Sequence, residues 1–78
     1  MRPPSEVVHQ HLALYLGPYT AKNALKTFSA KALGKAPEAV TLTEAPQLLQ
    51  ALRPMMRTLL GVQQCEHILR QVTKELGL

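Results

Sequence analysis

Every glycine in this chain follows a leucine, and every Leu-Gly pair closes a segment whose apolar residues have helical spacing. The pairs are Leu16-Gly17, Leu33-Gly34, Leu60-Gly61 and Leu76-Gly77. Glycine is favoured just past the C-terminus of a helix because it adopts the left-handed backbone there without steric cost. No alternating apolar and polar pattern between hairpin turns competes with this interpretation. The sequence therefore predicts an all-α fold with four short helices.

The expected helices span residues 5–16, 19–33, 44–60 and 62–76. The third has the strongest pattern, with Thr43 expected as its N-cap. Its apolar residues recur every three or four positions and define one face. That face comprises Leu48, Leu49, Leu52, Met55, Met56, Leu59 and Leu60. Pro54 removes one backbone hydrogen bond from this helix, so we expect a kink or a break near it.

Short connections between consecutive helices favour antiparallel neighbours. The expected architecture is a compact bundle or orthogonal array, formed by a single domain that covers residues 5–78. Residues 1–4 are expected to form a flexible arm, because Pro3-Pro4 favours extended backbone. Val40 and Leu42 are expected to plug one end of the core, and Gly77-Leu78 predicts a Schellman ending. No internal repeat is evident.

The composition narrows the classes of function only slightly. A net charge of +4 over 78 residues permits contact with nucleic acid, anionic lipid or an acidic protein, and selects none of them. The lone Cys65 excludes an intrachain disulfide and a cysteine-based zinc site. No segment has the length and apolarity of a signal peptide or a membrane span, so we expect a cytoplasmic protein without membrane association.

Residues capable of catalysis or metal binding are few and poorly placed. His9 and His11 are two positions apart on an expected helix and therefore point to opposite sides, and the same holds for Cys65 and His67. The chain has no aspartate, its glutamates form no evident acid/base pair, and its glycines form no phosphate-binding loop. We therefore predict no catalytic residue, metal, cofactor or small-molecule substrate.

One stretch resembles part of a known family. Residues 30–44, AKALGKAPEAVTLTE, have the small-x-x-Leu-Gly pattern and proline-containing turn seen in some bacterial helix-turn-helix repressors. The resemblance implies a DNA-binding unit. The flanking segments depart from that pattern: Gly17-Pro18 interrupts the preceding helix, and the following helix carries Pro46 and the most apolar face of the chain. We therefore do not assign the chain to this family.

The first helix has an apolar arc wider than one neighbouring helix needs, which indicates a second contact surface. This feature predicts a non-enzymatic protein–protein interaction module that binds another protein or itself, with an adaptor or regulatory role in bacterial signalling. The expected contact residues are Val7, His11, Leu14 and Tyr15, with Arg53 and Arg57 as a basic rim for an acidic partner.

The alternative is a nucleic-acid-binding domain. Three pairs of basic residues have i,i+4 spacing on three different helices, and such ridges could converge on one phosphate-binding face. The pairs are Lys22 with Lys26, Arg53 with Arg57, and Arg70 with Lys74. Glu66 is also expected to pair with Arg70 along the last helix.

Overall fold

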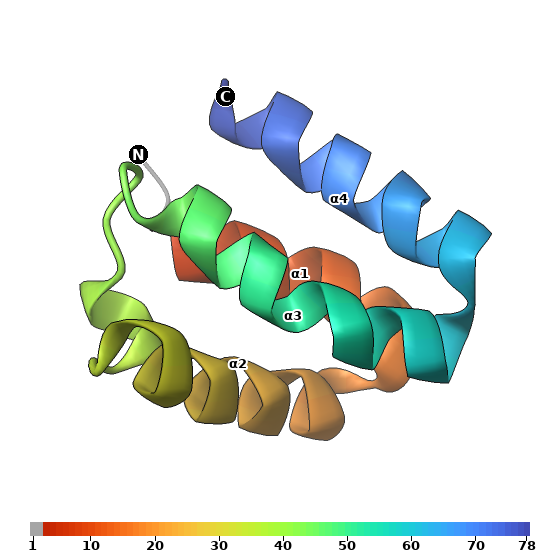
Figure 1. Cartoon of the computed structure of the whole chain (residues 1–78), viewed down its shortest axis with the longest axis horizontal. Coiled ribbons are helices and arrows are strands. Elements are labelled where there is room, and N and C mark those ends of the chain that lie inside the picture. The colour runs from red at the N-terminus through yellow and green to blue at the C-terminus, as the bar shows by residue number, and fades with distance from the viewer. Residues whose placement is uncertain (1–2) are drawn as a thin grey trace.

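The computed structural model describes residues 3–78, and they form the four expected helices without any strand. The helices are α1 (Pro4–Leu16), α2 (Pro18–Leu33), α3 (Ala45–Leu60) and α4 (Val62–Leu76), and a 3₁₀ turn, η1 (Pro37–Ala39), follows α2 (Figure 1). The all-α prediction is confirmed. Of the expected N-terminal arm, residues 1–2 lie outside the described residues, and Pro4 already belongs to α1.

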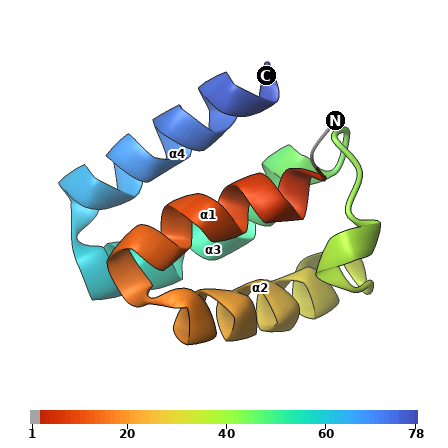
Figure 2. The same cartoon turned by 180° about the vertical axis from the view of Figure 1, so that it is seen from behind.

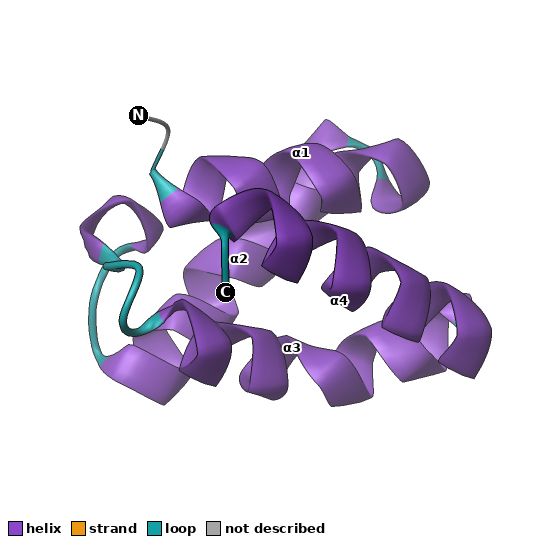
Figure 3. Cartoon of the chain, turned by 90° about the horizontal axis from the view of Figure 1, so that it is seen from above, coloured by secondary structure: helices purple, strands orange, loops and turns teal. Residues whose placement is uncertain are grey.

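The four helices form a diamond in cross-section. α1 and α3 run through the middle, while α2 and α4 lie on opposite sides of them (Figures 1 and 3). α1 packs on α2 and α4, α3 packs on α4 and α2, and α2 and α4 have no packing contact with each other. Each helix directs its apolar face to the centre, where burial of a Leu, Ile or Met side chain contributes roughly 1.5–3 kcal/mol. Leu12, Leu48, Leu52, Met56 and Ile68 are among the fully buried side chains.

Two of the helix connections are single glycines with nearly the same geometry. Gly17 joins α1 to α2 with φ 85° and ψ 156°, and Gly61 joins α3 to α4 with φ 87° and ψ 163°. At each corner the glycine N–H donates to the preceding helix and its carbonyl accepts from the following one, at 3.0 Å in all four bonds. This backbone region is almost exclusive to glycine, because a Cβ would clash with the chain itself. The sequence therefore turns sharply at both positions without a loop.

The matching corners belong to an internal repeat that the sequence analysis did not detect. Most positions 44 residues apart have a similar degree of burial in the two halves. The buried residues Val8, Leu12, Ala21 and Leu25 correspond to Leu52, Met56, Cys65 and Leu69, which are also buried. The helix contacts follow the same relation, since α1 meets α2 as α3 meets α4, and α2 meets α3 as α4 meets α1. The chain is thus built from two helix–glycine–helix units with approximate twofold symmetry.

The sequence predicted how α3 begins and how α4 ends, and only the second prediction is confirmed. Thr43 is not the N-cap of α3; Glu44 precedes the helix, and its carboxylate accepts from the Thr41 N–H at 3.1 Å and binds Lys35. The Schellman ending is confirmed, because the Leu78 N–H donates to the Thr73 carbonyl across a left-handed Gly77.

α3 continues through Pro54 as one helix, so the expected break does not occur. Pro54 and Gln50 both lie on the exposed side of α3, where the Gln50 carbonyl left without its usual donor remains accessible to water. The loop before α3 fills the core only in part. Val40 is buried as expected, whereas Leu42 is exposed.

Candidate functional site

Five of the seven large apolar side chains that are exposed in the described chain lie next to the two glycine corners. Both corners lie at the same end of the molecule, opposite the end where α1 begins and α4 finishes (Figures 1 and 2). We call the segments 14–21 and 58–65, which contain these corners, the corner end. Its exposed large apolar residues are Leu14, Tyr15, Tyr19, Leu59 and Val62, with exposed fractions of 75%, 40%, 77%, 56% and 59%.

These residues lie in the last turns of α1 and α3 and in the first turns of α2 and α4, next to the corners. α1 and α3 each continue for a last turn before the glycine, and the apolar pattern continues with them. Leu59 was expected on the packed face of its helix but is 56% exposed, although Leu60 beside it in the last turn packs against the core. The corresponding position in the other half, Tyr15, is also exposed.

The corner end carries no formal charge. Neither LYLGPYTA (14–21) nor TLLGVQQC (58–65) contains a Lys, Arg, His, Asp or Glu residue. The nearest charged positions in the chain are Lys22, Arg57 and Glu66, each directly next to one of these segments. Covering these two segments removes apolar surface from water without desolvating an ion of their own, while the ions at their border are the Arg57 and Glu66 pair and Lys22.

The four contact residues expected on the first helix separate into two groups. Leu14 and Tyr15 belong to the corner end. Val7 is buried against the core, and therefore adds nothing to the exposed surface. The His11 Nε2 lies 2.9 Å from the Glu75 Oε2, which links α1 to α4 within the molecule.

Arg53 and Arg57, the expected rim, both lie near one carboxylate. Arg53 Nη1 donates to Glu66 Oε2 at 2.6 Å, and Arg57 Nη2 lies 3.9 Å from the same oxygen. Glu66 therefore pairs across the α3–α4 interface with Arg53, rather than with Arg70 along its own helix as expected. Arg53 is a link between helices, whereas the half-exposed Arg57 borders the corner end.

The basic ridges do not meet on one face. Lys22 and Lys26 lie on α2 and Arg70 and Lys74 lie on α4, on opposite sides of the molecule (Figure 1). The remaining pair on α3 is held by Glu66 as described above. The geometry thus separates the charges that a nucleic-acid-binding face would bring together.

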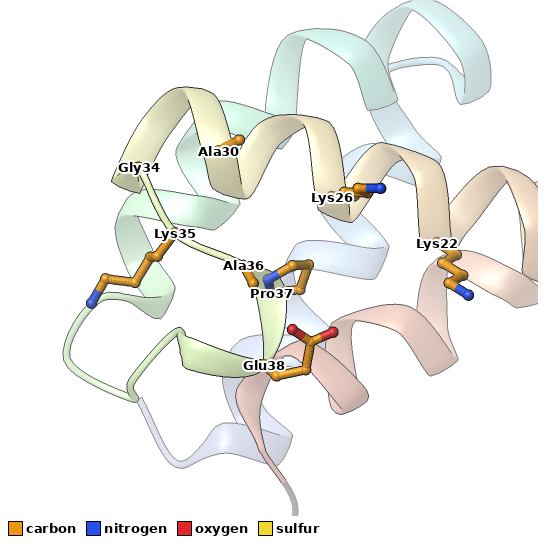
Figure 4. A pocket seen from close by; sticks show the side chains of 8 residues that line it. All are labelled: Lys22, Lys26, Ala30, Gly34, Lys35, Ala36, Pro37 and Glu38. Carbon is orange, nitrogen blue, oxygen red and sulfur yellow. The ribbon is translucent and has the colours of Figure 1, made fainter.

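An open groove of about 540 Å³ runs between α2 and η1. Lys22 and Lys26 flank it, and the Glu38 carboxylate lies on the opposite wall (Figure 4). Lys35 points away from the groove and binds Glu44 at 2.7 Å. The hydrogen bond from Lys35 lowers the pKa of the Glu44 carboxyl from its usual value, and the hydrogen bond from the Thr41 N–H is the second contribution in the same direction. The groove therefore offers charges of both signs and no reactive group.

The remaining side chains that could act as nucleophiles or metal ligands are Cys65 and the histidines. Burial is the main cause that raises the pKa of the Cys65 thiol, and the nearby Glu66 carboxylate is the second. The raised pKa favours the unreactive protonated form. The His9 Nε2 lies 3.2 Å from the Pro18 carbonyl oxygen. Within residues 3–78, no three His, Cys, Asp or Glu side chains lie together as metal ligands.

No protein-family model, curated protein or solved structure matches the chain, so these comparisons identify no family for it. Among the described helices, none combines the length and apolarity needed to cross a bilayer. Of the corner end, sequence reasoning identified Leu14 and Tyr15 and missed Tyr19, Leu59 and Val62. The missing signal was the absence of charge on both sides of Gly17 and Gly61.

Proposed function

We propose that this chain is a non-enzymatic protein–protein interaction module that binds another polypeptide through the corner end. The observation that carries the proposal is the gathering of five large exposed apolar side chains on one uncharged end of a small domain. Scattered exposed apolar residues are common on proteins, but a concentration of them without charge is typical of binding surfaces.

The chemistry of the surface favours a polypeptide over a small molecule. The groove between α2 and η1 lies away from the corner end, whereas the groove on α4 starts at Val62, Gln63 and Gln64 of the corner end and continues to Glu66, His67 and Arg70. Tyr15 and Tyr19 combine an apolar ring with a hydroxyl group, a pairing that is enriched at protein interfaces. An adaptor or regulatory role in the bacterial cytoplasm stays a prediction from the sequence.

Site-specific photocrosslinking in the source cell tests this proposal. The variants Leu14→p-benzoylphenylalanine and Leu59→p-benzoylphenylalanine place the crosslinker on the corner end. Leu78, which is 48% exposed at the opposite end, provides the matched control position. We expect discrete polypeptide adducts, including adducts with the chain itself, from positions 14 and 59 only. Absence of adducts there, or equal adducts from position 78, would contradict the proposal.

A further inference from the structure

We infer that the polypeptide bound at the corner end is a second copy of this chain, docked corner end to corner end about a twofold axis. This inference rests on the proposed function and names its partner. Three properties of the corner end support it: its charge, its symmetry and its size.

The charge distribution favours a second copy over an oppositely charged partner. The chain has a net charge of +4, so two copies repel each other wherever their charged faces meet. Segments 14–21 and 58–65 of the corner end contain no charged residue that would face a second copy. An acidic partner would gain its affinity from the lysines of α2 or the basic residues of α4, which lie outside this surface. An uncharged surface on a basic chain thus suits contact between copies.

The symmetry of the corner end matches what such a dimer needs. A twofold dimer interface must be complementary to itself, because the same patch is contributed by both subunits. Here the patch consists of two corners of the same backbone geometry, in which the exposed Tyr15 corresponds to Leu59, and Tyr19 to Gln63, 44 positions later. A twofold axis through this end therefore places apolar corners opposite apolar corners in both halves of the contact. The Tyr19 hydroxyl and the Gln63 amide supply complementary hydrogen-bonding groups around them.

The size of the corner end predicts how tight the dimer is. The molecule measures 28 × 24 × 19 Å, and the corner end caps its longest axis. A contact across that end would bury on the order of 400 Å² per copy, about half of what a standard stable interface buries per partner. We therefore expect a reversible dimer with a dissociation constant on the order of micromolar or weaker, rather than a permanent one.

Light scattering after size-exclusion chromatography gives the first test. The mass should rise from that of the 8.6 kDa monomer toward twice that value as concentration increases. The rise should be at least as large at about 500 mM as at about 50 mM salt, because salt does not weaken an apolar contact and screens the repulsion between two basic copies. A monomeric mass up to about 1 mM chain, or an association that salt abolishes, would overturn the inference.

Charge-swapped variants locate the contact. Leu14→Glu, Leu14→Lys, Leu59→Glu and Leu59→Lys each place a charge on an exposed position, so the monomer should keep its helical circular dichroism. Each variant alone should weaken dimerisation at least about tenfold, because the charge must be desolvated in the interface. Leu78→Glu, at the opposite end, should dimerise like the unchanged chain.

Mixing the variants completes the test. Dimers should reform when Leu14→Glu chains are mixed with Leu14→Lys chains, if like corners meet, or with Leu59→Lys chains, if unlike corners meet. Failure of both mixtures to restore the dimer would overturn the inference. A monomeric chain that still crosslinks a different polypeptide from positions 14 and 59 would refute the second copy while leaving the proposed function intact. A chain that crosslinks nothing would refute both.

Discussion

At the scale of single residues, comparison of the two halves of the repeat identifies a buried hydroxyl group that has no hydrogen-bond partner among the described residues. Ser29 on α2 and Thr73 on α4 are equivalent, 44 residues apart, and both carry hydroxyl groups. The Thr73 Oγ1 donates to the Leu69 carbonyl at 2.7 Å. The Ser29 Oγ is buried and has no hydrogen-bond partner in the described part of the chain. A buried hydroxyl without a partner keeps its desolvation cost uncompensated.

We therefore predict opposite effects for two substitutions that remove these hydroxyls. Ser29→Ala should raise the free energy of unfolding by about 1 kcal/mol, because it removes the unpaired hydroxyl and Ala has the higher helix propensity. Thr73→Val should lower it by up to about 1 kcal/mol through loss of the hydrogen bond. Urea unfolding followed by circular dichroism measures both. Similar destabilisation by the two substitutions would show that Ser29 is in fact satisfied.

At the scale of elements, the two corner glycines should tolerate substitution less than the two that only end a helix. Gly17 and Gly61 have φ near 85° with ψ near 160°, whereas Gly34 and Gly77 are left-handed helical with ψ 27°. Beyond the adjoining residues, no atom of the described chain lies within 4 Å of a Cβ built on any of them, so the cost comes from the local backbone conformation and not from a clash with packed neighbours.

Substitution by alanine separates the two classes. Gly17→Ala and Gly61→Ala should each lower the free energy of unfolding by about 1–3 kcal/mol, since their backbone region is essentially closed to other residues. Gly34→Ala and Gly77→Ala should each cost about 1 kcal/mol, because non-glycine residues visit the left-handed helical region at moderate cost. Thermal and urea unfolding measure the four variants in parallel. Equal costs in both classes would mean that the corners relax to another geometry.

The helices could be predicted from the sequence because their signals are local. A Leu-Gly pair ends each helix, and i,i+3 and i,i+4 spacing assigns the buried face, so all four helices were located within one or two residues. The repeat could not be predicted in this way, because Met56 occupies the environment of Leu12 and Cys65 that of Ala21. Cores constrain volume and apolarity more than identity, so equivalent positions need not share a residue.

The candidate site was predicted only in part, because exposure depends on where neighbouring helices stop. Periodicity places Val7 and Leu59 on apolar faces, but it does not indicate that α1 is covered at Val7 and that α3 is uncovered at Leu59. The Arg53–Glu66 contact joins residues on different helices, and its partner choice follows from packing that spacing within one helix does not encode.

At the scale of the whole molecule, the proposed association draws on the same architecture that stabilises the fold. A chain of 78 residues buries a modest core, so its expected stability is only about 4–12 kcal/mol. Each glycine corner shortens the connection between two helices, and exposed apolar side chains lie next to both corners at the same end. The feature that makes the fold compact thus also creates the surface through which we propose that the chain binds its partner.

This proposed association predicts that thermal stability depends on concentration. A partner that binds only the folded chain stabilises it, and a concentration about tenfold above the dissociation constant adds about 1.4 kcal/mol. For a domain of this size, such an increment raises the melting temperature by roughly 5–10 °C. We expect that rise between about 10 µM and about 1 mM chain in the unchanged protein and in Leu78→Glu, and its loss in Leu14→Glu. Differential scanning calorimetry measures the melting temperature directly. The prediction would be contradicted by a melting temperature that stays constant over this range in the unchanged protein, or that rises equally in Leu14→Glu. Either result would show that stability does not depend on contact at the corner end.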